Sequence, residues 1–279
     1  MSAVELQREI LDRLGAGDDV FAAEAMKEKA AAVAAALAEQ AEARPEGTVE
    51  ERVATLLGVV LPVVEYGGGA AVDVLPRALA HVARQTSLTQ TQSSLPFLAG
   101  TLVVGRLGWA IAAYALHCRR LDGLTAAWRA ALPSRYDDQL SPPLLADSSL
   151  RHADVFERHA GKGYADYRGW LERRDLIHER YPLFAAELAE VFAEADFILA
   201  LRSAAALRWE LYSEGFTSAT VGRFHARLAD ARLREQLAQL FDVDGNELNE
   251  TLAQAYTRLR ANQHSWERPP ARLFAATDE

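Results

Sequence analysis

The sequence predicts an all-α protein, a helical bundle of roughly nine to eleven helices. Apolar residues recur at the three- and four-residue spacing of helices along most of the chain, and no stretch shows the alternation of a half-buried strand. Half of the 279 residues are apolar and a quarter are charged, which is ordinary for a globular protein. A chain of this length can bury a large core, in one domain or in two lobes.

We expect the bundle to form around the helix 95–118. From Phe97 to Cys118 only Arg106 is formally charged. A helix that is apolar on every face is buried either in a large helical core or in a membrane. A charge at the centre of a membrane span costs about 2.5 to 3.5 kcal/mol, which favours the core. In the core, Arg106 is a buried charge that needs an Asp or Glu from elsewhere in the chain as its partner.

The rest of the chain predicts further helices, arranged in two lobes. The N-terminal lobe covers residues 1–131 and contains the central helix, and a connection with three prolines covers 132–144. The C-terminal lobe covers 145–261, and an irregular tail covers 262–279. Periodicity and capping residues place helices at 3–14, 20–43, 48–65, 71–84, 122–131, 145–158, 164–180, 182–212, 218–241 and 246–261. The three glycines after Tyr66 indicate a flexible turn.

Charge and composition limit the classes of function. The net charge of −9 argues against nucleic-acid binding by the whole surface. The single cysteine, Cys118, excludes an internal disulfide and a cysteine-based zinc site, and no other metal or cofactor site is expected. The first residues lack the apolar core of a signal peptide, so a cytoplasmic protein is expected. The excess of arginine over lysine, with much alanine, is typical of a GC-rich bacterial genome.

The segment 151–180 is the richest in chemically active side chains. Lys162 lies between two glycines before a predicted helix, where bare N–H groups and a lysine can hold an anion. Tyr164, Arg168 and Trp170 follow within two turns, and such aromatic and basic residues can stack and hold a nucleotide or single-stranded RNA. A ligand- or anion-binding site is therefore one hypothesis for this segment.

An alternative for the same segment is metal-free ribonuclease chemistry. Arg173 and His178 have the spacing of the arginine and histidine that cleave RNA in all-helical nucleases of the HEPN class, and Arg258 and His264 repeat it. The spacing is no more frequent here than chance predicts for a chain so rich in arginine. The spacing therefore adds a catalytic alternative for this segment, and nothing further in the chain resembles the HEPN nucleases.

The absence of any complete catalytic set favours a non-enzymatic function. We expect a partner-binding or regulatory helical subunit of a bacterial multi-protein assembly. Its docking elements would be the acidic N-terminal helices, the segment 158–174, and the tail with Trp266 and Phe274. Two alternatives stay open: a nucleotide or RNA sensor or HEPN-like ribonuclease that uses residues 158–180, and a membrane-active effector that inserts helix 95–118. The sequence does not predict the oligomeric state.

Overall fold

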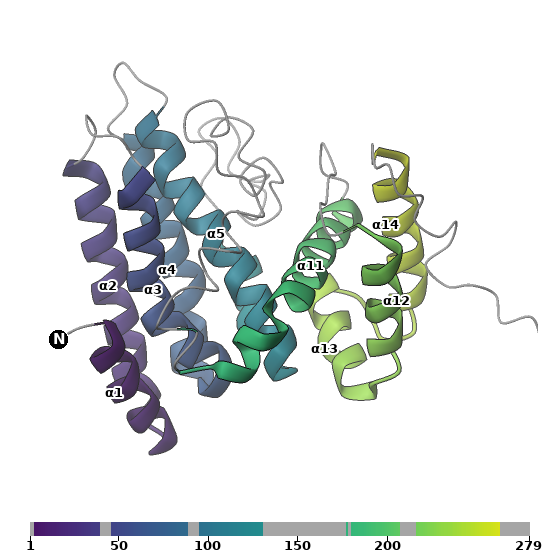
Figure 1. Cartoon of the computed structure of the whole chain (residues 1–279), viewed down its shortest axis with the longest axis horizontal. Coiled ribbons are helices and arrows are strands. Elements are labelled where there is room, and N and C mark those ends of the chain that lie inside the picture. Colours follow the sequence, from purple (N-terminus) through teal and green to yellow (C-terminus); the bar gives the residue numbers. More distant parts are fainter. Residues whose placement is uncertain are drawn as a thin grey trace, which may run out of the picture.

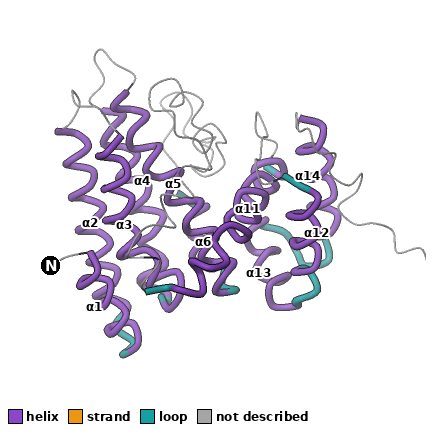
Figure 2. The backbone as a smooth tube through the Cα atoms, viewed as in Figure 1, coloured by secondary structure: helices purple, strands orange, loops and turns teal. Residues whose placement is uncertain are grey.

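The computed structural model describes residues 3–39, 46–88, 95–130, 177, 180–206 and 216–262. Within these residues the chain forms ten helices and no strand (Figure 1, Figure 2). The all-α prediction is therefore confirmed. The helices are α1 (Ala3–Gly15), α2 (Asp19–Glu39), α3 (Glu46–Tyr66), α4 (Gly69–Leu88), α5 (Leu95–Cys118), α6 (Asp122–Trp128), α11 (Pro182–Ala205), α12 (Ser218–Arg227), α13 (Ala231–Phe241) and α14 (Leu248–Asn262).

The central helix α5 has the predicted bounds and the predicted environment. It packs against α3, α4 and α11, and each residue from 103 to 116 is buried. Arg106 is only 6% exposed and interacts with another group of the protein, as a buried charge requires. That this partner is an Asp or Glu stays a prediction. Among the described helices, none combines the length and hydrophobicity that a membrane crossing requires.

The turn between α3 and α4 is formed at the predicted glycines and fixes the start of α2. The Gly68 N–H donates to Asp19 Oδ1 at 2.9 Å. A Cβ atom on Gly68 would lie 2.1 Å from the other carboxylate oxygen of Asp19, so a side chain at this position would displace the carboxylate and disturb the bond. Asp18 caps α2 by accepting the N–H of Phe21 at 3.1 Å. The start of α2 is thereby tied to the turn between α3 and α4.

The C-terminal helices follow their capping residues. Pro182 lies in the first turn of α11, where its missing N–H costs nothing. The prediction of one helix over 218–241 is wrong, because the chain forms α12 and α13 with a break at 228–230. Asp230 causes this break, since its side chain accepts the N–H groups of Arg232 and Leu233 and so starts a new helix.

The helices are arranged in two groups on either side of α5 and α11. Figure 1 shows α1 to α4 on one side and α12 to α14 on the other. The short helix α6 contacts α4 and α5, and it also reaches α13. The N–H of Leu121 donates to Gln236 Oε1 at 3.2 Å, and the guanidinium of Arg202 lies 5.2 Å from the ring centre of Trp128. The predicted connection 132–144 lies outside the described residues, so the division into lobes stays a prediction.

Candidate functional site

The site residues predicted from the sequence lie outside the described residues. This applies to the proposed anion and nucleotide site, to the alternative catalytic pair and to the aromatic residues of the tail: Lys162, Tyr164, Arg168, Trp170, Arg173, His178, Trp266 and Phe274. These assignments stay predictions. The described helices contain a different candidate site.

That candidate is a groove between α2 and α4, which we call the basic groove. It has a volume of about 610 Å³. Four basic residues line it: Lys27 on α2, Arg77 and His81 on α4, and Arg129 directly after α6. Between them lie small apolar side chains, namely Ala30, Ala31, Val74, Pro76, Ala78 and Ala80. The groove therefore combines an apolar floor with cationic donors.

Local sequence explains how the basic groove forms. Arg77 and His81 are four residues apart on α4, so their side chains share one face of that helix. The alanines of α2 keep its surface low where it packs against α4. Arg129 joins them because α6 packs against α4. Three separate segments therefore bring their cations to one place.

The charge in the basic groove is poorly compensated by the protein itself. Lys27 pairs with Glu24 at 2.6 Å, and both side chains are exposed. Arg77, His81 and Arg129 form no ion pair within the described part of the chain, and no acidic side chain described there lines the groove. The whole chain carries a net charge of −9, so this cluster runs against the general charge of the surface. Such a cluster attracts anions.

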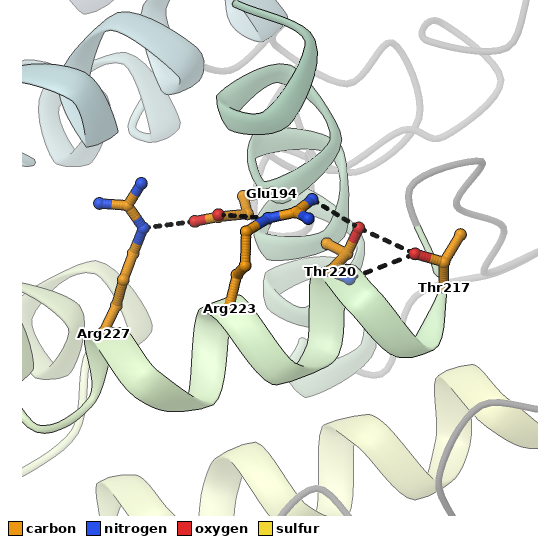
Figure 3. Close-up of polar contacts among 5 residues, drawn as sticks. All are labelled: Glu194, Thr217, Thr220, Arg223 and Arg227. Carbon is orange, nitrogen blue, oxygen red and sulfur yellow. Dashed lines mark hydrogen bonds and ion pairs between the residues drawn. The ribbon is translucent and has the colours of Figure 1, made fainter. Parts of the chain in front are cut away.

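A second group of charged residues, shown in Figure 3, is a structural clamp between α11 and α12. Glu194 of α11 is 1% exposed, and its two oxygens accept from Arg223 Nε at 3.0 Å and from Arg227 Nε at 2.5 Å. Arg223 also donates to Thr220 Oγ1 at 3.3 Å. Because both carboxylate oxygens are used inside the protein, we assign the clamp to stability.

A third polar group ties α5 to its neighbours. Tyr114 donates a hydrogen bond to Glu65 of α3, and its ring packs at an angle against those of Tyr181 and Phe184 at the start of α11. Burial raises the pKa of the Tyr114 and Tyr181 hydroxyls, so both stay protonated at neutral pH. Burial also raises the pKa of the Cys118 thiol to about 12, so it is a poor nucleophile at neutral pH.

No described residues form a metal centre. Groups of three or more His, Cys, Asp or Glu side chains close enough to hold an ion do not occur in the described helices.

Asp196, which is fully buried on α11, accepts the indole N–H of Trp109 at 3.0 Å. Its carboxylate therefore serves the contact between α5 and α11.

Sequence reasoning missed the basic groove. One signal was present, since Arg77 and His81 lie one turn apart in a helix that was predicted correctly. Lys27 and Arg129 could not be added to them, because their place depends on how α2 and α6 pack against α4. The segment 151–180 gives a stronger local signal, because its basic and aromatic residues are close in sequence.

Comparisons with known proteins assign no family. No family model matches the chain, and none of the curated proteins or solved structures is significantly similar to it. The fold and the basic groove are therefore the observations from which a function is inferred.

Proposed function

We propose that the protein is a non-catalytic regulatory protein that binds a small organic anion in the basic groove. The observation that carries the proposal is the presence of three cationic side chains and a histidine around an apolar groove, in a chain whose net charge is −9. The anion would complete the charge balance that Arg77 and Arg129 lack.

The shape and chemistry of the groove support an anion with an aliphatic body. A volume of about 610 Å³ suits a small ligand. The planar guanidinium of Arg77 or Arg129 can donate two parallel hydrogen bonds to a carboxylate or phosphate. Alanine, valine and proline form the apolar walls, and the described lining includes no Phe, Tyr or Trp ring on which a base could stack. A fatty-acid-like carboxylate therefore fits better than a nucleotide.

The proposal is tested by calorimetric titration with octanoate, which carries a carboxylate on a flexible apolar chain. Acetate has the charge without the chain, and octanol has the chain without the charge. We expect octanoate to bind and both analogues to bind at least about tenfold more weakly, because each loses one of the two favourable terms.

Variants then locate the binding. Arg77→Ala should weaken octanoate binding about tenfold or more, since a charge-assisted hydrogen bond contributes about 1.5 to 3 kcal/mol. Arg232→Ala on α13 removes another exposed arginine, which does not line the groove, and should leave binding unchanged. If wild-type protein binds octanol as well as octanoate, or if the two variants behave alike, the proposal is wrong.

A protein partner remains a second proposal, supported by one end of the bundle. Large apolar side chains are exposed there: Val20, Tyr66 and Leu183. The bond between Asp19 and Gly68 brings the start of α2 beside the turn that follows Tyr66. Affinity purification from the native host should recover a partner with the wild type and lose it with Val20→Ser, Tyr66→Ser and Leu183→Ser combined. Equal recovery by both would refute docking at this end.

A further inference from the structure

A second pocket lies where α1, α3 and the start of α11 meet, and we call it the tyrosine pocket. Its volume is about 370 Å³. Tyr66 and Tyr181 form its aromatic walls, and Leu11 adds an aliphatic one. Charged side chains of both signs complete the lining, namely Asp12, Glu65 and Arg180. This composition differs from that of the basic groove, whose described lining includes basic side chains but no acidic ones.

The opposite charges in the tyrosine pocket do not neutralise each other. Asp12 and Arg180 are exposed, and neither forms an ion pair within the described residues. One oxygen of Glu65 is already taken by the Tyr114 hydroxyl. The pocket thus offers a guanidinium to a negative group and two carboxylates to a positive group, from three different segments of the chain.

A buried polar atom beside the pocket also lacks a partner. Gln7 is 1% exposed, and its Nε2 donates to the Tyr181 hydroxyl at 3.1 Å. In the described part of the structure its Oε1 accepts no hydrogen bond. Exchanging the two amide atoms would only move the defect to the nitrogen. Buried polar groups are rarely left unsatisfied, so the site around Tyr181 has unused hydrogen-bonding capacity.

Part of the pocket is held in place before any ligand arrives. Tyr181 is fixed by Gln7 on one side, and its ring centre lies 4.9 Å from that of Tyr114. Arg120 donates to the backbone oxygens of Glu65 and Gly67, which fixes the end of α3. A wall that is already ordered loses little entropy when a ligand binds against it.

From these observations we propose that the tyrosine pocket binds a small zwitterion with an ammonium and a carboxylate, the α-amino acids being the simplest class. Arg180 would bind the carboxylate, and Asp12 with Glu65 would bind the ammonium. Leu11 and the rings of Tyr66 and Tyr181 would receive an apolar side chain. A simple anion would leave Asp12 unpaired, and a simple amine would leave Arg180 unpaired. The site is separate from the basic groove and stands without it.

The test is calorimetric titration of the full chain with L-leucine, with the other standard L-amino acids screened beside it by thermal shift. Two analogues of leucine separate the charges: isopentylamine lacks the carboxylate, and 4-methylpentanoate lacks the ammonium. We expect an amino acid to bind and both of its single-charge analogues to bind about tenfold to one-hundredfold more weakly. Binding of an analogue as tightly as its amino acid, or no response to any amino acid, would overturn the proposal.

Two surface variants assign the roles of the charged groups. Arg180→Ala should weaken the amino acid about tenfold or more and leave the affinity for the amine analogue unchanged. Asp12→Asn should weaken the amino acid and leave the affinity for the acid analogue unchanged. Both positions are exposed, so folding is not at risk, and Arg232→Ala on α13 serves as the control. If Arg180→Ala and Asp12→Asn bind like the control, the ligand lies elsewhere and the proposal fails.

Discussion

The clamp on Glu194 predicts how much stability each of its side chains contributes, because the three side chains differ in how exposed they are. Glu194 is 1% exposed, whereas the side chains of Arg223 and Arg227 are 34% and 25% exposed. The two sides of the clamp are therefore not equivalent. If the carboxylate is lost, water can reach both guanidinium groups. If both arginines are lost, a buried carboxylate remains without any compensating charge.

The expected costs follow from this asymmetry. Glu194→Gln keeps the shape, but its amide oxygen can accept from only one arginine and its NH2 group faces the other donor, so we expect a loss of about 2 to 3 kcal/mol in the free energy of unfolding. Arg223→Met with Arg227→Met should cost more, about 3 to 5 kcal/mol, because it strands the buried charge. Adding Glu194→Leu to the two methionines should recover most of that loss, since no buried charge then remains.

Urea unfolding followed by far-UV circular dichroism measures these free energies. The order of stability should be wild type, then Glu194→Gln, then the double arginine variant, with the triple variant above the double one. If the double arginine variant is as stable as Glu194→Gln, or if the triple variant is the least stable of all, then the carboxylate is not buried between the arginines as described.

Three further predictions concern the polar contacts of α5 and its end. Trp109→Phe should lower the free energy of unfolding by about 1 to 3 kcal/mol, because it removes a hydrogen-bond donor from a buried carboxylate. Trp128→Phe should lower it less, since the indole N–H of Trp128 has no partner among the described residues. Urea unfolding compares the two variants. Tyr114→Phe should cost about 1 to 2 kcal/mol by the same assay, because half-buried Glu65 can be rehydrated, and an unchanged stability would contradict the bond. The pKa of Cys118 is raised to about 12 from 9.0, so the unfolded chain loses this proton first and native stability should fall as pH rises above about 9. Thiol labelling at about pH 8 should be at least about tenfold slower in native protein than in urea, and equal rates would refute this assignment.

The sequence predicted the elements better than it predicted their contacts. The bounds of α5 and the start of α11 at Pro182 were correct, because a continuous apolar run and a proline are local signals. The break between α12 and α13 was missed, although Asp230 is a common capping residue, because apolar spacing continues through Leu228 and Leu233 on either side of it.

The candidate sites were not predictable in the same way. Arg77 and His81 share a helix face, and this much can be read from their spacing. The approach of Lys27 and Arg129 depends on the packing of three helices, which has no local signal. The same holds for Gln7 and Tyr181, which meet across 174 residues of sequence. Local patterns therefore identify buried helices and capping residues, whereas pockets arise from contacts that only the folded chain specifies.

The central claim, that the basic groove holds an organic anion, is tested most directly by locating such an anion. Crystals of the protein with octanoate carrying a terminal bromine would give the bromine position from anomalous scattering. We predict a bromine peak against Ala31 and Pro76, with the carboxylate beside Arg77. A peak elsewhere on the molecule, or no peak at ligand concentrations that saturate the calorimetric signal, would contradict the account.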